Sequence, residues 1–454
     1  MKMKIKMILQ SDESIIDKKV DVFGWVKSIR DQKEFAFIEI NDGSSLKNLQ
    51  GVITSDNQDF RKIFEIQTGA SLKLTGKIVK SPGKNQTYEM KVESIHIFGR
   101  CPEDFPLQKK RHSFEFLRTI AHLRNRTNTF GAVNRIRNTL FYHTHQFFQK
   151  RDFFYIQTPI ITSSDTEGAG ALFRVTTLDD LKKPDSEDFF KKKAFLTVSG
   201  QLNAEALACG LSDVYTFGPT FRAENSHTSR HLAEFWMMEP EMAFCDLDED
   251  IKISEEYIKY MVEIALKENK EDIEFFDNFI EKGLVQRLSL VLDSEFKKIS
   301  YTEAVDILIK SKQTFDYKVS WGCDLQSEHE RYLTEKHFKK PVVVTDYPKE
   351  LKAFYMKNNP DNKTVRAMDI LVPKIGEIVG GSQREDDYDT LISKIKEKNL
   401  DVENYSWYLD LRKYGTAPHS GFGVGFERLI LFITGMENIR DVIAFPRAPG
   451  NLDF

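Results

Sequence analysis

The sequence lacks the features of a secreted or membrane-spanning protein. It contains only four cysteines, with no CxxC spacing and no histidine cluster beside any of them, so we expect neither a disulfide framework nor a structural zinc site. No run approaches the ~18 apolar residues of a membrane span. The first residues, MKMKIKMILQ, reach charged side chains too soon for a signal peptide. These absences predict a cytoplasmic protein without a membrane partner.

Internal repeats and low-complexity tracts are also absent. Hydrophobic residues make up 41% and charged residues 30% of the 454, an ordinary globular composition that excludes a disordered or fibrous chain. At about 100–200 residues per domain, the length predicts two or three domains.

Charge is distributed unevenly along the chain. Residues 1–151 carry 27 Lys and Arg against 16 Asp and Glu, whereas the remainder carries 38 against 53. A basic first third joined to an acidic body predicts a polyanion-binding module on a larger domain. Charge does not separate DNA from RNA, and chance clustering remains the alternative.

Residues 20–99 alternate between apolar and polar positions and are interrupted by turn residues at 41–43 and 81–85. They predict five strands: Val20–Ile29, Phe35–Ile40, Gly51–Thr54, Ala70–Val79 and Tyr88–Phe98. Five short strands in this span favour a small barrel of the oligonucleotide-binding (OB) type. We assign residues 1–102 to this barrel and residues 103–129 to a hinge.

Residues 130–454 are expected to form the main domain. A helical pattern covers Phe130–Lys150, polar helix-periodic segments between 246 and 340 suggest an inserted helical region, and strand-like runs return at 341–345 and 368–372. Strands and helices without βαβ alternation predict an α+β fold built on an antiparallel sheet.

The densest chemical segment is a predicted antiparallel hairpin with strands Val214–Arg222 and Glu234–Phe244. Alternate residues of a strand share a face, so Met237, Glu239 and Glu241 should point together. An arginine at a strand end and an Arg-His pair at the base of the loop suit a bound triphosphate. A surface hairpin with solvated charges is the alternative.

Two further segments carry weaker signals. Asp369 and Glu377 flank a turn and offer the oxygen ligands that Mg²⁺ prefers, although on this segment alone an ordinary turn is the better explanation. The segment Gly421–Gly425 has GxGxG spacing and no surrounding βαβ unit, so a dinucleotide-binding fold is not expected. Arg428, at the start of the next helix, suits stacking on a base or contact with a phosphate.

Together the segments resemble, in order and spacing, the three signature motifs of the class II aminoacyl-tRNA synthetases, specifically the aspartyl/asparaginyl/lysyl subgroup with an N-terminal anticodon barrel. The first motif corresponds to Phe153–Ile160, the second to the hairpin containing Arg222, and the third ends at Arg428. The resemblance implies a homodimer, because the first motif forms the subunit interface in this family.

Shorter signatures within the resemblance favour the members that act on asparagine. One signature is Phe221–Asn225, in which Arg222 is followed eight residues later by the pair Arg230-His231. The other is Val198–Asn203. The aspartyl members typically carry a lysine where this chain has Ala204. The expected reaction joins asparagine to its tRNA through an asparaginyl-adenylate, consumes ATP with Mg²⁺ and releases AMP and pyrophosphate. The partners are L-asparagine and the tRNA for asparagine, with no DNA expected.

The resemblance also implies residue roles. The catalytic residues would be Arg222, Glu377 and Arg428. ATP would be held by Arg222, Glu224, Arg230, His231, Phe235 and Arg428. The amino acid would be held by Glu167, Ser199, Gln201, Glu239 and Arg384. Asp369 and Glu377 would bind the metal, although Gly380 stands where related enzymes place a ligand serine. The anticodon would contact Arg30, Phe37 and Gln50.

The hypothesis that the protein selects asparagine over aspartate depends on only a few residues. Arg384 can donate to the side-chain oxygen that asparagine and aspartate share, whereas Glu239 can accept from the amide NH₂ and repel a carboxylate. Three alternatives stay open: an aspartate–tRNA ligase, including the relaxed kind that also charges the tRNA for asparagine; a tRNA-binding protein without charging activity; and a ligase that makes free asparagine.

Overall fold

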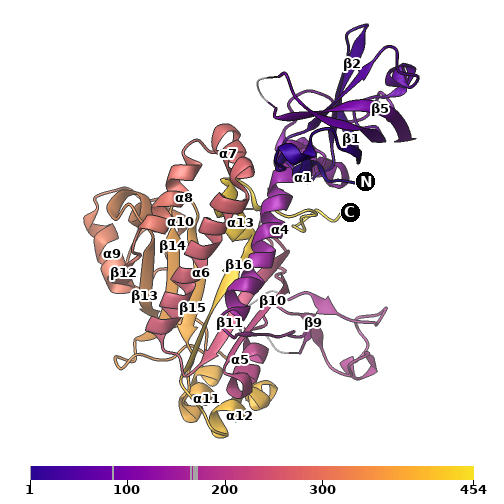
Figure 1. The fold of residues 1–454 in the computed structure, drawn as a ribbon. Helices are drawn as coiled ribbons and strands as arrows, with labels where there is room; N and C mark the ends of the chain where they lie inside the picture. The colour runs from indigo at the N-terminus through magenta and orange to yellow at the C-terminus, as the bar shows by residue number, and fades with distance from the viewer. Residues whose placement is uncertain (1, 84–85, 164–165, 167–171, 227) are drawn as a thin grey trace. The chain divides into compact units, whose positions relative to one another are not determined.

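The computed structural model describes residues 2–454 except 84–85, 164–165, 167–171 and 227. The chain divides into two compact units, Met1–Arg135 and Ile136–Phe454. The border falls within helix α4 (Asn128–Gln149), which corresponds to the helix predicted from the sequence. Figure 1 shows the ribbon of both units, which are described separately below.

The first unit contains the predicted five-stranded barrel. Its strands are β1 (Lys19–Asp31), β2 (Phe35–Asn41), β3 (Leu49–Thr54), β4 (Ser71–Lys80) and β5 (Tyr88–Gly99). They close in the order β1-β2-β3-β5-β4, so the prediction of an OB-type barrel is confirmed. Residues 19–25 of β1 pair with β4 and residues 25–31 pair with β2, and a bulge between Val26 and Ser28 interrupts the second pairing.

Alternation along the strands builds the core of the barrel, because every second side chain points inward. Val20, Val22, Ile38, Leu72 and Leu74 are fully or almost fully buried. The rest of the unit consists of short helices: α1 (Ile5–Leu9), η1 (Glu13–Ile15), η2 (Phe60–Glu65), α2 (Phe114–Thr119) and α3 (Ala121–Arg124). The last two lie in the segment predicted to be a hinge.

The second unit is built on an eight-stranded sheet in the order β12-β13-β14-β15-β16-β11-β10-β6. The strands are β6 (Phe154–Tyr155), β10 (Asp213–Phe221), β11 (Glu234–Ala243), β12 (Lys297–Ser300), β13 (Val342–Pro348), β14 (Thr364–Val372), β15 (Gly376–Gln383) and β16 (His419–Gly425). Neighbours from β13 to β10 are antiparallel as predicted, but the edge strands β12 and β6 pair in parallel. Neither edge strand is joined to its neighbour by a hairpin, which would require antiparallel pairing.

Helices cover the sheet and fill the rest of the unit (Figure 1). They are α5 (Gln201–Leu211), α6 (Leu247–Glu268), α7 (Lys270–Phe279), α8 (Leu284–Asp293), α9 (Tyr301–Lys310), α10 (Ser327–Arg331), α11 (Tyr388–Glu397), α12 (Ser406–Lys413) and α13 (Phe426–Thr434). Helix α6 packs on β14, β15 and β16, and α5 packs on β10 and β11. The span 246–340, predicted to be helical, also supplies strand β12 to the sheet edge.

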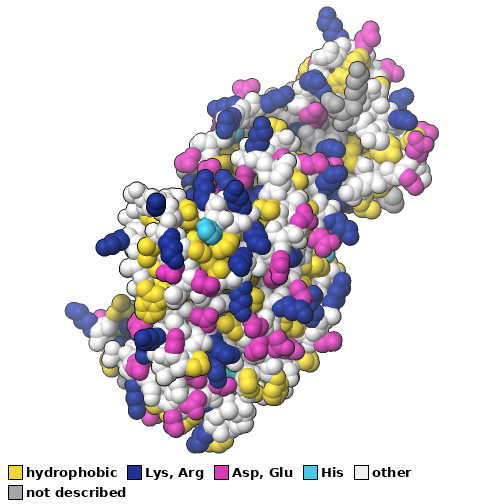
Figure 2. All heavy atoms as spheres, turned by 90° about the vertical axis from the view of Figure 1, so that its left-hand side faces the viewer, with side chains coloured by type: hydrophobic (Ala, Val, Ile, Leu, Met, Phe, Trp, Pro, Cys, Tyr) yellow, Lys and Arg dark blue, Asp and Glu magenta, His cyan; other side chains and the backbone are white. Residues whose placement is uncertain are grey.

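Smaller elements complete the second unit. A three-stranded sheet in the order β7-β9-β8 contains β7 (Ile161–Thr162), β8 (Arg174–Val175) and β9 (Ala194–Leu196). Single turns are the π-helical η4 (Tyr332–His337) and the 3₁₀ helices η3 (Asp185–Glu187), η5 (Lys349–Leu351), η6 (Val402–Tyr405) and η7 (Ile439–Asp441). On the face shown in Figure 2, acidic and basic side chains are interspersed. In the described part of the chain, no helix has both the length and the apolar character needed to cross a bilayer.

Candidate active site

Two adjoining cavities, of about 860 and 750 Å³, form a cleft over strands β11, β15 and β16. Arg222, Met237, Glu377 and Gly423 line both cavities, so the cavities meet at these residues. The glycine repeat of β16 keeps the floor of the cleft open. A Cβ atom on Gly423 would lie 2.7 Å from Met237 Cε, so the end of the Met237 side chain would have to shift. On the same strand, a Cβ atom on Gly421 would lie 2.4 Å from the Pro240 backbone oxygen, so this glycine allows β16 to pack closely against β11.

The first cavity brings together all six residues predicted to hold ATP. They are Arg222, Glu224, Arg230, His231, Phe235 and Arg428. Arg222 directly follows β10, and its guanidinium carbon lies 5.5 Å from the centre of the Phe235 ring on β11. The antiparallel pairing of these two strands places the arginine and the aromatic ring at the same end of the hairpin.

Arg428 joins the first cavity from helix α13. Its Nη1 atom donates to the backbone oxygen of Glu377 at 3.1 Å and lies 3.3 Å from Glu377 Oε2. Burial acts to raise the pKa of Glu377, but Arg428 and Lys352 outweigh it, so this pKa is lowered. The carboxylate is therefore ionised at neutral pH and available as a ligand.

Polar contacts hold the loop of the hairpin. Arg230 donates from Nη1 to Ser327 Oγ at 2.6 Å and from Nη2 to the Lys374 backbone oxygen at 3.2 Å. His231 Nδ1 shares a hydrogen bond with Ser226 Oγ at 3.1 Å. Burial lowers the pKa of His231, and the Arg428 guanidinium lowers it further, so a neutral imidazole is favoured until an anion binds.

The two predicted metal ligands converge over one glycine. A Cβ atom on Gly380 would lie 3.2 Å from Glu377 Oε1 and 3.6 Å from Asp369 Oδ1. Asp369 on β14 pairs with Gly380 on β15, which brings the two carboxylates together across the strands. Two carboxylates at one point form the hard-oxygen donor set that fits Mg²⁺, and Gly380 has no side-chain oxygen to add to it.

Lys352, which was not predicted from the sequence, lines the second cavity. Its Nζ atom donates to both carboxylate oxygens of Asp369, at 2.9 and 2.8 Å. Burial raises the pKa of Asp369, and Lys352 acts against that rise. Lys352 lies in a lysine-rich stretch, residues 349–357, in which charge alone distinguishes no residue. The Lys352 ammonium group therefore places a cation in the second cavity, although Ala204 replaces the lysine expected of aspartyl enzymes.

The second cavity contains four of the five residues predicted to hold the amino acid. Ser199, Gln201, Glu239 and Arg384 line it, whereas Glu167 lies outside the described residues. The Ser199 hydroxyl donates to Glu239 Oε1, and the backbone N–H of residue 200 donates to Glu239 Oε2 at 3.0 Å. The predicted shared face of β11 is also present, because Met237, Glu239 and Glu241 all line this cavity.

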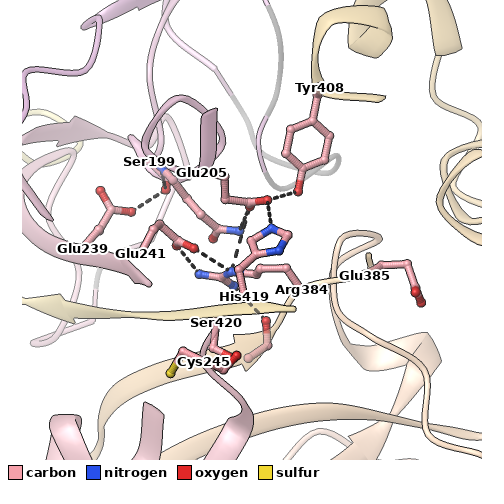
Figure 3. A network of polar contacts seen from close by, with 12 residues as sticks. Ser199, Glu205, Glu239, Glu241, Cys245, Arg384, Glu385, Tyr408, His419 and Ser420 are labelled. Atoms are coloured by element: carbon pink, nitrogen blue, oxygen red, sulfur yellow. Dashed lines mark hydrogen bonds and ion pairs between the residues drawn. The ribbon is translucent and has the colours of Figure 1, made fainter. Parts of the chain in front are cut away.

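A buried ionic network that was not predicted from the sequence begins in the wall of the second cavity and extends behind it (Figure 3). Arg384 Nε donates to Glu241 Oε2 at 3.1 Å, and Arg384 Nη2 donates to Glu241 Oε1. Glu205 Oε2 accepts from Tyr408 at 2.6 Å and from Arg412 at 2.8 Å, and it lies 3.1 Å from His419 Nε2. Arg412 and His419 lower the pKa of Glu205 against the effect of burial.

The predicted anticodon residues come together on the outer face of the barrel. Arg30 on β1 pairs with Phe37 on β2, and the guanidinium carbon lies 5.3 Å from the ring centre. Arg30 Nη2 donates to Gln50 Oε1 at 3.4 Å, and Gln50 Nε2 donates to Glu89 Oε2 at 3.2 Å. An exposed cation beside an aromatic ring, with an amide next to them, is suited to a stacked and hydrogen-bonded base.

The segment expected to form a subunit interface, Phe153–Ile160, has exposed apolar side chains next to the buried Phe153 and Ile156. Phe154 and Tyr155 form the edge strand β6, and the side chain of Phe154 is 54% exposed. Ile160, Ile161 and Phe141 are exposed as well, and together with Trp236 they border a groove.

Comparison with protein families gives two matches. The family described as tRNA synthetases class II (D, K and N) matches residues 114–449. The family described as OB-fold nucleic acid binding domain matches residues 20–98.

Individual proteins are similar over the whole chain. An asparagine–tRNA ligase of Protochlamydia amoebophila is 58% identical and covers 97% of both chains. The chloroplastic/mitochondrial asparagine–tRNA ligase of Arabidopsis thaliana is 55% identical over 98% of this chain and 82% of its own. Among solved structures, asparaginyl-tRNA synthetase of Pyrococcus horikoshii complexed with asparaginyl-adenylate has a TM-score of 0.89 and 35% identity, and it covers 100% of this chain and 99% of its own.

Proposed function

The chain belongs to the class II tRNA synthetases of the aspartate, lysine and asparagine group, and we propose that it attaches asparagine to its tRNA. In the first step asparagine and ATP give asparaginyl-adenylate and pyrophosphate. In the second step the asparaginyl group passes to the tRNA and AMP leaves. The observation that carries this proposal is the full-length similarity to an enzyme solved with asparaginyl-adenylate, together with a cleft whose two cavities suit the two halves of that molecule.

The first step requires two anions to meet. The carboxylate of asparagine attacks the α-phosphorus of ATP, and pyrophosphate is the leaving group. Arg222 lines both cavities, so its guanidinium can contact the α-phosphate and the attacking carboxylate together. A preorganised cation at this point stabilises the charge that develops in the transition state, and no protein nucleophile is needed.

The remaining residues of the first cavity bind the rest of ATP. Phe235 and Arg428 offer an aromatic ring and a guanidinium plane to the adenine. Arg230 and His231 offer their polar groups to the outer phosphates. Asp369 and Glu377 would hold Mg²⁺, which would neutralise phosphate charge when bound. Glu167, Ser199 and Gln201 would bind the α-amino group of asparagine.

The tRNA would bind through the barrel. Phe37 would stack on an anticodon base, Gln50 would read the central uracil, and Arg30 would contact phosphates. The apolar groove beside β6 supports a homodimer formed through the segment Phe153–Ile160. The cytoplasm, where aminoacyl-tRNA is used, is the proposed location.

Pyrophosphate exchange tests this function. The wild-type protein is incubated with ATP, labelled pyrophosphate and either asparagine or aspartate, and charging of tRNA is then measured with each amino acid. Exchange and charging with asparagine support the proposal. Exchange and charging with aspartate but not with asparagine would make the protein an aspartate–tRNA ligase, and charging of the tRNA for asparagine with aspartate would identify the relaxed kind. Absence of exchange with both amino acids would leave only a tRNA-binding protein.

A further inference from the structure

The three-stranded sheet β7-β9-β8 carries an arm, residues 176–193, that links strand β8 to strand β9. Figure 1 shows this arm projecting away from the eight-stranded sheet of the second unit. The proposed reaction assigns no role to it. The tip of the arm exposes both aromatic rings and lysines, a combination that proteins use to bind single-stranded RNA.

Phe189 and Phe190 form the centre of a turn at the tip of the arm. The backbone N–H of Lys191 donates to the backbone oxygen of Asp188 at 2.9 Å, which closes the turn around the two phenylalanines. Turn centres are ordinarily occupied by small or polar residues. Here Phe189 is 73% and Phe190 44% exposed, and their rings meet edge to face with centres 4.8 Å apart. Two adjacent rings in solvent offer a surface on which a flat ligand can stack.

A buried carboxylate holds this turn in place. Asp188 is buried and accepts hydrogen bonds from the hydroxyl groups of Thr176 and Thr177. It also accepts from the backbone N–H groups of Thr177 and Phe189, at 3.0 and 2.8 Å. These bonds, that of the Thr176 hydroxyl first, lower the pKa of Asp188, so the carboxylate is ionised at neutral pH. The exposed rings therefore stand on a preorganised support.

Lysines surround the two rings. Residues 191–193 are lysines that follow the turn directly, residues 182–183 are lysines that precede η3, and all five side chains are exposed. The arm also has five acidic residues. Two of them, Asp185 and Asp188, contact Arg174 at 2.9 and 3.9 Å. The other three are outnumbered by the lysines, so the surface of the tip complements a polyanion.

The arm begins beside the catalytic cleft. The backbone oxygen of Thr197, the residue after β9, accepts from the N–H of Phe221 at 2.9 Å. Phe221 directly precedes Arg222, and Val198 lines the second cavity. The chain between Phe190 and Val198 can span at most about 30 Å. The tip therefore lies within reach of a polymer whose end enters the cleft.

We propose that the tip of the arm binds the acceptor end of tRNA, with Phe189 and Phe190 stacking on its unpaired bases and residues 191–193 contacting its phosphates. This inference rests on the proposed function, in which the second step brings the 3′ end of the tRNA to the adenylate in the cleft. Stacking on an aromatic ring and contact of lysine with phosphate both tolerate any base. The tip thus holds the acceptor end without reading its sequence.

Two sets of substitutions test this proposal. Phe189→Ala combined with Phe190→Ala removes the rings, and alanine at residues 191–193 removes the charges. For each variant, kcat/KM for tRNA in charging and the rate of asparagine-dependent pyrophosphate exchange are measured. We expect kcat/KM for tRNA to fall by about tenfold or more and exchange to stay unchanged. The variant without the lysines should also depend less steeply on salt, because fewer counterions are released.

Two control variants match these changes. Phe279→Ala on helix α7 removes a phenylalanine that is also 73% exposed, and it should charge tRNA normally. Arginine at residues 191–193 keeps the positive charge and can contact phosphates, so kcat/KM for tRNA should stay within about threefold of wild type. Loss of charging in the arginine variant equal to that in the alanine variant would contradict a role for the charge.

Footprinting of the bound tRNA locates the contact. Wild-type protein should protect the unpaired 3′ end and the anticodon loop from hydroxyl radicals, and the alanine variants should lose only the first protection. Unchanged charging in both alanine variants would overturn the proposal, as would equal loss of exchange and charging. A lower particle mass of these variants in light scattering would also overturn it, because the tip would then belong to an interface between two copies of the chain.

Failure of the proposed function would look different. A wild-type protein that charges no tRNA with asparagine would contradict that function. The footprint does not require charging, so it would still decide the inference: protection of the 3′ end that disappears in the alanine variants supports it, and protection that persists in them overturns it.

Discussion

Lys352 Nζ lies 2.9 and 2.8 Å from the two carboxylate oxygens of Asp369. Both side chains are more than four-fifths buried, with exposed fractions of 18% and 14%. The lysine reaches Asp369 from the loop after β13, whereas the second carboxylate, Glu377, lies on β15. The protein thus provides its own cation where two carboxylates would otherwise repel each other, a role that the proposed Mg²⁺ would share.

We expect Lys352→Met to destabilise the metal-free protein by about 3 kcal/mol, because removing one partner leaves a buried carboxylate without its cation. Addition of Mg²⁺ should raise the melting temperature of the variant more than that of the wild type, since a ligand stabilises the state it binds. Thermal melts with and without Mg²⁺ measure both effects. Lys298→Met, which removes an exposed ion pair with Asp248, is the control and should change stability by less than about 1 kcal/mol. Equal Mg²⁺ responses in wild type and Lys352→Met would contradict this role.

Arg222→Ala should reduce asparagine-dependent pyrophosphate exchange by about 10²-fold or more, because the carboxylate then approaches the α-phosphate without its cation. Arg222→Lys keeps a point charge but loses the planar pair of donors, so an intermediate loss is expected. Initial rates of exchange at saturating ATP provide the measurement. A rate for Arg222→Ala within about threefold of wild type would remove Arg222 from the mechanism.

Phe37→Ala should weaken tRNA charging and leave pyrophosphate exchange intact, because stacking on an aromatic ring contributes about 1–3 kcal/mol per base. Gln50→Ala should act in the same direction. Phe64→Ala, at another exposed phenylalanine of the same unit, is the matched control and should charge tRNA normally. For each variant, kcat/KM for tRNA in charging and the rate of pyrophosphate exchange are both measured. Parallel loss of the two activities would show that the barrel is not an independent anticodon module.

Phe154→Asp should convert a dimer into monomers, because a charge at the exposed edge strand β6 would be buried without a partner in the interface. Sedimentation or light scattering gives the mass of the particle. The control Phe279→Asp changes a phenylalanine that is 73% exposed on helix α7 and should leave the mass unchanged. A wild-type protein that is monomeric at micromolar concentration would contradict the homodimer.

The sequence by itself determined the local elements and the identity of the chemical segments. Strands of the barrel follow from period-two alternation between turn residues, as in Phe35–Asn41, and the β10–β11 hairpin follows from two strand-like runs on either side of a polar loop. Residues on one strand face, such as Met237, Glu239 and Glu241, could be grouped correctly because their spacing fixes their direction. These properties depend on neighbours within a few residues, which is why the sequence alone was sufficient for them.

Only the tertiary structure determined which buried charged side chains pair with one another. Glu241 and Arg384 are 143 residues apart, and Glu205 and Arg412 are 207 residues apart. Lys352 reaches Asp369 from a stretch without any distinguishing motif, and the parallel pairing of β6 and β12 depends on the order of strands in the sheet. Such pairings arise when the sheet brings distant segments side by side and burial makes an unpartnered charge costly. No periodicity or local spacing encodes that choice.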